Sequence, residues 1–438
     1  MGLMSLARRT AFWTMDALKG GPIRKAYNDI KKIDETDSDS TYVIRYQEQA
    51  WKNLKEHACA NTKAYAPYSS CEFEDFPIIS KQDIRQAQED YMSCSFDRER
   101  LITMSTSGST GTPFVCYQNG FKKRRVNAEV IYYSEKVGYR LGDNLSYIRT
   151  IVKQNKKSGF KQFIQNQTLI NCGQLSDQGV ELLIDELAKR SRKGLVTLLA
   201  YGSTYTALKD YFLKKGISEL GHHKIVGAIS GSDMLFDETR TVIAEVFGNI
   251  PVVSRYSNEE NGVLGQDEGI NNVFSLNEAN YIIEIVDDAG NPVEEGVCGR
   301  IVVTDLYNYA MPMIRYDTGD VGAIQTFEIS GRRKKAICQF AGRRVDVIFD
   351  ADGNALSPHV LTNYMWEFPE ITQFQLIQTG DGQYCMKLNV DESFHREEEV
   401  VAVLYQMLGE RARIRIEKVA EIPVLASGKR RYIVNEWK

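Results

Sequence analysis

The first hundred residues carry a helical pattern of polar and apolar positions. Charged residues lie between apolar ones over 28–55 and 80–89, a pattern typical of amphipathic helices. Residues 3–18 also fit a short amphipathic helix. We expect it to pack on its own domain, the alternative being contact with a membrane surface. No residues in this stretch indicate a particular chemistry.

From residue 101 the pattern changes to short apolar runs separated by glycine-rich segments. LITM and FVCYQ predict two strands on either side of STSGSTGTP at 105–113. Farther along, LVTLLAY predicts a buried strand that runs into a helix, KIVGAIS another strand, and PVVSRYS a third. The helix before PVVSRYS has Asp237 as its capping candidate and ends near Gly248. Strands alternating with helices in this way predict a layered α/β body with much parallel pairing.

After Asn261 the pattern becomes rich in strands. YIIEIVD, GRIVVTDL, PMIRYDTGDVGAI and AICQF predict an antiparallel subdomain. Beyond Gly342, the strand VDVIF, a helix opened by Ser357 and Pro358, a hairpin, a second helix and the strand ARIRIEKV predict a small α+β domain. We therefore expect a large N-terminal domain, residues 1–344, and a small C-terminal lid domain, residues 345–438.

Composition excludes several classes of protein. The chain has 438 residues, 43% hydrophobic and 26% charged, with a formal net charge of −4, which is ordinary for a globular protein and unlike disordered, collagen-like or fibrous chains. Its 54 basic and 58 acidic residues form no broad basic field, so nucleic acid is not expected as a partner. The N-terminus lacks the apolar core of a signal peptide and no apolar run is long enough to span a membrane, so a cytoplasmic location is expected.

Eight cysteines are spread along the chain without a CxxC pair or a tight Cys/His spacing. This distribution indicates neither a disulfide framework nor a zinc site.

The strongest local signal is the loop at 105–113, where two glycines stand among six hydroxyl residues. Glycines let the backbone approach phosphate oxygens closely, and successive N–H groups with hydroxyl donors can form an anion-binding nest. No Gly-Lys-Ser/Thr follows, so it is not a Walker loop. A polar surface loop remains the alternative. The candidate phosphate-binding residues are Ser107, Gly108, Ser109, Thr110, Gly111 and Thr112.

With this loop, the chain resembles the adenylate-forming superfamily of acyl-CoA synthetases, nonribosomal-peptide adenylation domains and firefly luciferase. Four further segments carry the resemblance in matching order: RYSNEENG at 255–262, MIRYDTGD at 313–320, GRRVDVI at 342–348 and IPVLASGKRRY at 422–432. The chain length and the sequence MIRYDTGD are most similar to those of the phenylacetate-CoA ligase and CapK-like branch. Relatives in that branch occur in aromatic-acid catabolism and in surface-polysaccharide gene clusters.

The resemblance implies ATP as a substrate, because members of this family join a carboxylate to the α-phosphate and release pyrophosphate. Asp320 would then bind the ribose diol, for which a carboxylate is suited, and Arg343 the ribose or phosphate. Taken alone, Asp320 would be a turn-capping residue and Arg343 a solvated surface arginine.

Glu260 matches the family's Mg²⁺-binding glutamate, and Mg²⁺ prefers oxygen ligands that it shares with phosphates. Two adjacent glutamates leave open which one faces the metal, so Glu259 is the reserve. Tyr256 would stack near the adenine. The segment departs from the family pattern at Ser257 and Glu259.

Lys429 follows Ser427 and Gly428 and matches the catalytic lysine, which would stabilise charge between carboxylate and α-phosphate. A solvated basic tail is the alternative. The resemblance gives catalytic roles to Lys429, Thr110 and Glu260 together. It also implies that the small domain closes and then rotates about a hinge, where Val345 replaces the usual Asp or Lys.

Ser232 and Asp233 follow the strand KIVGAIS and resemble the family's adenine loop. Residues 200–203 could border the acyl pocket, as could Tyr132 and Tyr133, although such aromatics are more often core residues. Some members of the branch hold zinc through a Cys/His cluster after the glutamate motif, but VLGQDEGINNVFSLNEANY has neither residue type. No metal besides Mg²⁺ is therefore expected.

The sequence as a whole predicts ATP-dependent activation of a small, possibly aromatic, carboxylic acid to an acyl-adenylate, followed by thioester formation with CoA. One alternative passes the acyl group to a carrier protein, or to an amine or hydroxyl of a sugar in surface-polysaccharide biosynthesis. Another is a nucleotide-binding module without catalysis. The chain leaves the acid and the oligomeric state open.

Overall fold

The structure is a computed structural model of the whole chain. It describes every residue except 1, 107–113, 150–161, 163–164, 172–176, 222, 232–233, 271, 344–347, 354, 357–360, 362–364, 366, 369, 424–430 and 438. For 106, 171, 341–343 and 355–356 it describes the backbone alone.

The chain forms two compact units. The first contains Met1–Ile283, Val302–Tyr316 and Gln325–Ile337; the second contains Glu284–Ile301, Asp317–Ile324 and Cys338–Lys438. The boundary predicted between residues 344 and 345 lies outside the described residues and stays a prediction.

Helices dominate the first hundred residues, as predicted, but they are shorter than the polarity pattern indicated. The stretch 28–55 is divided between α2 (Pro22–Asp34) and α3 (Thr41–Asn61), because Ser40 caps α3 by accepting the Val43 N–H. The other elements are α1 (Leu3–Leu18), η1 (Ala66–Tyr68), α4 (Lys81–Gln86), α5 (Gln88–Tyr91) and η2 (Arg98–Arg100).

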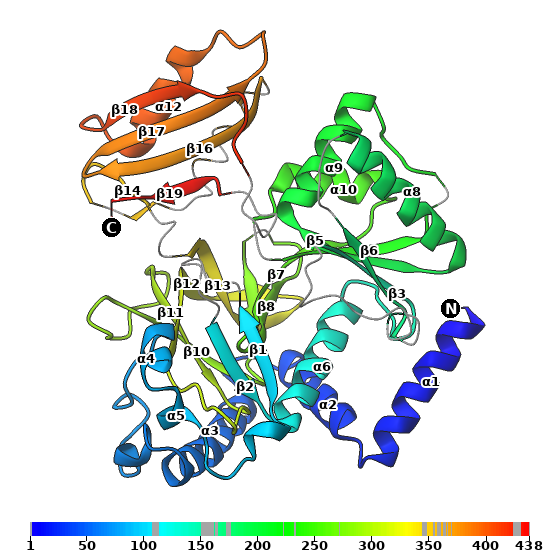
Figure 1. The fold of residues 1–438 in the computed structure, drawn as a ribbon, viewed down its shortest axis with the longest axis vertical. Helices are drawn as coiled ribbons and strands as arrows, with labels where there is room; N and C mark the ends of the chain where they lie inside the picture. The colour runs from blue at the N-terminus through cyan, green and yellow to red at the C-terminus, as the bar shows by residue number, and fades with distance from the viewer. Residues whose placement is uncertain are drawn as a thin grey trace. The chain divides into compact units, whose positions relative to one another are not determined.

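Parallel strands form the centre of the large sheet. β3 (Asn144–Arg149) pairs in parallel with β4 (Gln167–Asn171) and β5 (Val196–Tyr201), β5 pairs with β6 (Ile225–Gly231), and β6 with β7 (Val252–Asn258). The helices α8 (Asp177–Lys193), α9 (Gly202–Lys215) and α10 (Asp237–Val246) are grouped around these strands (Figure 1). Their shared core includes Leu187, Leu198 and Phe212. The predicted α/β body is confirmed.

The capping role predicted for Asp237 is wrong. Phe236 is the N-cap, with extended backbone (φ −83°, ψ 151°) and no side-chain cap, while Asp237 is the first helical residue. Its carboxylate therefore stands in the first turn, where it faces the positive end of the helix dipole.

The later strands do not form a subdomain with a sheet of their own. In the part of the chain that the structure describes, the large sheet has eleven strands in the order β10-β11-β12-β13-β9-β8-β7-β6-β5-β3-β4. The strands after β7 are β8 (Gly262–Asp267), β9 (Phe274–Leu276), β10 (Tyr281–Val286), β11 (Gly299–Asp305), β12 (Tyr316–Ile329) and β13 (Arg332–Arg343). Antiparallel pairing begins at the β7–β8 hairpin and continues through β9 and β13, so the sheet is mixed.

A separate antiparallel hairpin carries the candidate phosphate loop. β1 (Ile102–Thr106) pairs with β2 (Phe114–Gln118), Thr106 lying opposite Phe114. α6 (Gly120–Glu135) follows at once and is capped by Asn119, whose side chain accepts the Lys122 N–H. α2 and α6 share a core that includes Ile30 and Tyr133.

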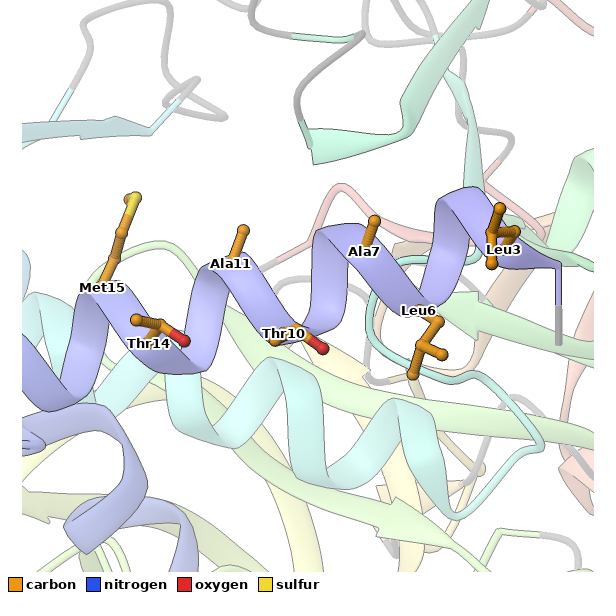
Figure 2. Close-up of a pocket in the computed structure, with 7 residues that line it drawn as sticks. All are labelled: Leu3, Leu6, Ala7, Thr10, Ala11, Thr14 and Met15. Atoms are coloured by element: carbon orange, nitrogen blue, oxygen red, sulfur yellow. The ribbon is translucent and has the colours of Figure 1, made fainter.

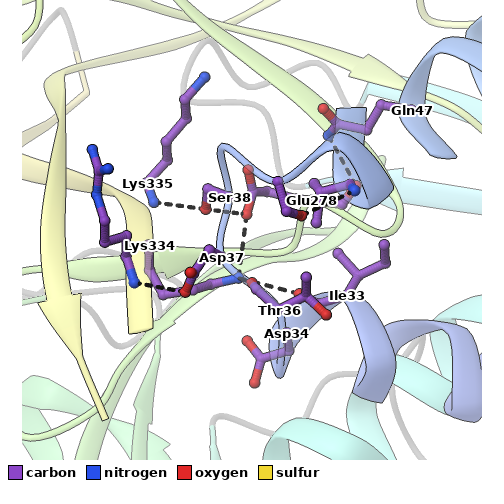
Figure 3. A network of polar contacts seen from close by, with 12 residues as sticks. Ile33, Asp34, Thr36, Asp37, Ser38, Gln47, Glu278, Lys334 and Lys335 are labelled. Carbon is purple, nitrogen blue, oxygen red and sulfur yellow. Dashed lines mark hydrogen bonds and ion pairs between the residues drawn. The ribbon is translucent and has the colours of Figure 1, made fainter. Parts of the chain in front are cut away.

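Polar contacts fix the α2–α3 connection to the rest of its unit (Figure 3). Ser38 Oγ donates to Glu278 Oε2 at 2.5 Å, and Lys334 Nζ lies 3.3 Å from the same oxygen. Gln47 Nε2 donates to the Glu278 carbonyl at 2.9 Å. The buried Glu278 is thus held by residues 38–47 and by Lys334, which are distant from it in the sequence.

The C-terminal part of the second unit is α+β, as predicted. β16 (Ile371–Gly380) and β17 (Gln383–Val390) form the hairpin, β18 (Arg413–Lys418) pairs in parallel with β17, and α12 (Glu397–Leu408) packs against them. A strand that the sequence did not predict, β19 (Ile433–Asn435), pairs in parallel with β16. The short strands β14 (Ile348–Phe349) and β15 (Ala355–Leu356) pair with each other.

The predicted helix start at Ser357 and Pro358 lies outside the described residues. Among the residues that the structure does describe, no helix has the length and hydropathy needed to cross a membrane.

Candidate nucleotide-binding site

Two cations lie beside the strand that leaves the candidate phosphate loop. Lys81 Nζ is 5.7 Å from the centre of the Phe114 ring, and Arg85 Cζ is 5.9 Å from it. Both side chains come from α4, which begins with a capping box between Ser80 and Asp83. Positive charge is therefore fixed near the point where residues 107–113 rejoin β2.

The turn between β7 and β8 contains both candidate metal-binding glutamates. Asn258 Oδ1 accepts the Asn261 N–H at 2.8 Å and closes the turn. Glu260 is 2% exposed, whereas Glu259 lies on the surface. The two glutamates thus occupy different environments.

Three segments of the chain meet at Glu260. Lys81 Nζ lies 2.5 Å from Glu260 Oε1, and the Tyr316 hydroxyl donates to the same oxygen at 3.1 Å. Gln118 Nε2, at the end of β2, donates to the Glu260 backbone carbonyl at 3.0 Å. The strand after the phosphate loop, the NEENG turn and the Tyr of MIRYDTGD are therefore in direct contact.

Cys116 lies below this cluster and is fully buried. Burial, with the nearby Glu260 charge, raises the pKa of its thiol, so Cys116 is an unreactive core residue.

The residues at Glu260 fit a magnesium ion that is shared with phosphates. Among the described residues, no three His, Cys, Asp or Glu side chains are grouped as a metal cage. Mg²⁺ commonly takes one or two carboxylates and completes its shell with water and phosphate oxygens. The single buried carboxylate of Glu260 suits that mode, and in the protein without a metal Lys81 balances its charge.

A buried polar network supports the NEENG turn from below. Glu129, on α6, accepts the Val263 N–H at 3.0 Å, and the Tyr281 hydroxyl lies 2.8 Å from both Glu129 Oε1 and the Asn261 carbonyl oxygen. Burial raises the pKa of the Glu129 carboxyl. Gly262 has a φ of +133°, and a Cβ there would lie 2.4 Å from Glu129 Oε2, so only glycine fits at this position.

Lys122 completes the network. It is fully buried, as is Asp305, and its Nζ lies 2.8 Å from Asp305 Oδ2 and donates to the Tyr281 hydroxyl at 2.9 Å. Buried ions of this kind need partners on all sides, because an unpaired charge in the interior is costly. α6, β10 and β11 are thereby tied to the turn that carries Glu260.

Tyr256 is buried on β7, with its ring edge to face with Phe274 at a centroid distance of 6.4 Å. Its stacking on adenine stays a prediction. Tyr132 and Tyr133 are core residues rather than walls of an open pocket, since they are 6% and 1% exposed. Residues 200–203, at the junction of β5 and α9, are also buried.

Asp320 and Arg343 belong to the second unit. The Asp320 N–H donates to Thr318 Oγ1, which in turn donates to the Ile301 carbonyl. Arg300 pairs with Asp317 at 3.0 Å, and Gly319 has a positive φ of +78°. The half-buried Asp320 thus stands near the start of β12, on a backbone that these contacts hold in place. For Arg343 the structure describes only the backbone, at the end of β13.

The other predicted site residues lie outside the described residues. They are Ser107, Gly108, Ser109, Thr110, Gly111, Thr112, Ser232, Asp233, Val345 and Lys429.

Sequence reasoning missed Lys81, Gln118 and Tyr316. Tyr316 stands inside MIRYDTGD and could have been singled out there, and Gln118 ends a strand that was predicted. Lys81 gave no signal beyond the helix start at Ser80, because its contact with Glu260 joins distant segments.

Comparison with known proteins agrees with the predicted fold class. Residues 348–436 match the family model of the CapK C-terminal domain. The chain is 23% identical over 434 residues to protein CapK of Staphylococcus aureus, covering 94% of this chain and 92% of that protein. It is 30% identical over 151 residues to phenylacetate-coenzyme A ligase of Thermus thermophilus, covering 31% of this chain and 34% of the ligase.

A solved structure of 2-hydroxyisobutyryl-CoA ligase, in the postadenylation state with R3-HIB-AMP, shares the fold. Its TM-score is 0.69 at 15% identity, over 91% of both chains. An open conformation of that ligase with 2-HIB-AMP and CoA gives a TM-score of 0.59 at 17% identity, over 88% of this chain and 90% of that one. These findings confirm the predicted fold class: the chain is CapK-like over nearly its whole length, is similar to phenylacetate-CoA ligase over about a third of it, and shares the fold of a solved adenylate-forming CoA ligase.

Proposed function

We propose that the chain is an ATP-dependent, AMP-forming ligase that activates a small carboxylic acid as its acyl-adenylate and then transfers the acyl group to CoA. The observation that carries this proposal is the contact of Glu260 with Lys81, Gln118 and Tyr316. It joins a carboxylate, a cation and the strand after a glycine-rich loop, which are the parts that a nucleotide triphosphate site needs.

In the proposed reaction an acid oxygen attacks the α-phosphorus of ATP and pyrophosphate leaves. The 107–113 loop would bind the phosphates, aided by positive charge from Lys81 and Arg85. Glu260 would hold Mg²⁺, whose chemistry is to neutralise charge on the phosphate oxygens. Asp320 would bind the ribose, and Lys429 would stabilise the charge that develops between the acid and the α-phosphate.

CoA is the proposed acceptor because the ligase with the same fold has been solved with both an acyl-adenylate and CoA. The thiol sulfur would attack the acyl carbon of the adenylate, and AMP would leave. A carrier protein would accept the same acyl group through sulfur. A sugar would accept it through an amine nitrogen or a hydroxyl oxygen.

The first test is carboxylate-dependent exchange of labelled pyrophosphate into ATP over a panel of small aliphatic and aromatic acids. At least one acid should support exchange, and Lys429→Ala should lower its rate by about 10²- to 10³-fold. Lys418→Ala, which removes an exposed lysine from the same unit, should leave the rate unchanged. Absence of exchange with every acid would instead favour a nucleotide-binding module without catalysis.

The second test identifies the acceptor. With the acid found by exchange, the acyl thioester should appear only when CoA is added. If adenylate accumulates although CoA is present, CoA is not the acceptor, and a carrier protein or sugar amine should be tried next.

A further inference from the structure

The outward face of α1 carries no charge. Ten of its sixteen residues are exposed, and all ten are apolar, alanine or threonine: Leu3, Met4, Leu6, Ala7, Thr10, Ala11, Thr14, Met15, Ala17 and Leu18. Figure 2 shows part of this face as two parallel rows, one with Leu3, Ala7, Ala11 and Met15 and the other with Leu6, Thr10 and Thr14. Surface helices normally turn such a stripe toward the core.

The opposite face of α1 is fixed to its own unit. Asp16 is buried and accepts the backbone N–H groups of Ile23 and Arg24 at 3.0 and 2.9 Å. Trp13 lies under the Arg24 guanidinium, 3.6 Å from the ring centre. A Cβ at Gly142 would lie 2.2 Å from the Ser5 carbonyl oxygen, so the helix backbone rests directly on that glycine. The apolar stripe is therefore the outer side of a docked helix.

The stripe has the symmetry of a surface that meets its own copy. A two-fold axis between Thr10 and Ala11 relates residue i to residue 21 − i, and every exposed position has an exposed partner under this rule. Four of the five pairs also match in size, with bulky residues at both ends and small ones at the centre: Leu3 with Leu18, Leu6 with Met15, Ala7 with Thr14, and Thr10 with Ala11; Met4 with Ala17 is the unequal pair. In an antiparallel pair of identical helices, residues related in this way lie opposite each other.

Shape and charge favour a second helix over a lipid surface. Leu3, Leu6 and Met15 surround a shallow hollow of about 590 Å³ above Ala7, Thr10, Ala11 and Thr14. Small residues at a crossing point let two helix backbones approach closely. A face without charge can meet its own copy without repulsion, whereas helices that bind anionic lipid carry Lys and Arg along the stripe. The helix itself carries two half-exposed arginines, Arg8 and Arg9, which are not among the ten exposed residues, and the exposed cations Lys19, Arg24 and Lys25 lie beyond its end.

We propose that α1 binds the α1 of a second copy of the chain, antiparallel, about a two-fold axis at Thr10 and Ala11. Leu3 and Leu18, 85% and 83% exposed, would then cover each other at both ends of a contact about 24 Å long. Ten residues a side is fewer than the roughly 20–30 of a standard interface, so the dimer should be weak and depend on concentration.

Sedimentation velocity of the full chain from about 1 μM to about 1 mM tests this. The weight-average mass should rise with concentration toward twice the 49.7 kDa of one chain. Ala11→Arg places two like charges at the axis and should keep the protein monomeric, with an unchanged circular dichroism spectrum because the position is exposed. Leu182→Arg, at an exposed apolar residue of α8, should dimerise like the wild type.

Cysteines introduced into α1 test the antiparallel geometry of the proposed helix pair. Ala11→Cys should give a disulfide dimer on mild oxidation, whereas Leu3→Cys should cross-link only in the double variant with Leu18→Cys. A wild type that stays monomeric throughout the range, or dimers that Ala11→Arg leaves intact, would overturn the proposal. So would binding to phosphatidylserine vesicles by a chain that does not self-associate, since lipid would then be the partner.

Discussion

Lys122→Met tests whether the buried network below Glu260 has the energetic role that its geometry indicates. The substitution keeps the length of the side chain and removes its charge. Asp305, fully buried 2.8 Å away, would then be an unpaired ion, and the Tyr281 hydroxyl would lose its donor. Breaking one side of a buried pair typically costs about 3–5 kcal/mol.

Urea unfolding, followed by tryptophan fluorescence and circular dichroism, measures this cost. For a chain with a slope near 3 kcal/mol/M, the loss corresponds to a midpoint lower by about 1–2 M. Trp51 packs against Phe73 and Phe76 in the first unit and reports its unfolding. Arg124→Met, which removes an exposed cation from the same helix, should change stability by less than about 0.5 kcal/mol.

The double variant Lys122→Met with Asp305→Leu completes the cycle. Because replacing both ions by apolar groups is often nearly neutral, it should be more stable than Lys122→Met alone, with a coupling energy of about 2 kcal/mol or more. A loss below about 1 kcal/mol for Lys122→Met, or a double variant that loses the sum of both single losses, would refute this reasoning.

Three further predictions follow from the same region and from α3. Gly262→Ala should cost about 1–3 kcal/mol in urea unfolding, because the new Cβ meets Glu129 and the φ is positive; equal stability would show that the turn is not constrained. Because Lys81→Met removes the cation that pairs with Glu260, this variant should have a lower melting temperature without Mg²⁺ and regain part of the loss when Mg²⁺ is added. A melting temperature that Mg²⁺ leaves unchanged in both the wild type and the variant would count against a metal at Glu260. Burial lowers the pKa of His57, so the unfolded chain binds its proton first as pH falls below about 6.5; stability should fall there with a slope of at most about 1.4 kcal/mol per pH unit, and His57→Gln should flatten it. An unchanged slope in that variant would assign the acid sensitivity to other groups.

The elements that sequence predicted well are those whose pattern is local. The run from 195 to 216 gave β5 and α9 because an apolar strand and an amphipathic helix differ in period, and Gly216 ends the helix with a positive φ. β19 was missed because three residues carry no period, and its pairing with β16 is made across the domain. Asp237 was misplaced by one residue, since composition favours it as a cap while the backbone turns at Phe236.

The candidate site also contains residues that local motifs predicted and residues that only the tertiary fold reveals. Motifs predicted Glu260 as a metal ligand with Glu259 in reserve, and burial distinguishes the two, which a sequence with two adjacent identical residues cannot do. Lys81, Lys122 and Asp305 could not be found from sequence, because lysine and aspartate are usually exposed and only the tertiary fold shows which ones form ion pairs with buried partners.

Isotope transfer from the acid to AMP is the most direct test of the proposed function. The acid selected by the exchange assay is prepared with ¹⁸O in its carboxylate and incubated with the chain, ATP and CoA. Attack of the carboxylate on the α-phosphorus predicts one ¹⁸O atom in each AMP formed, detected by mass spectrometry, and none in pyrophosphate. Label in inorganic phosphate with ADP as the product, or AMP without label, would contradict the account.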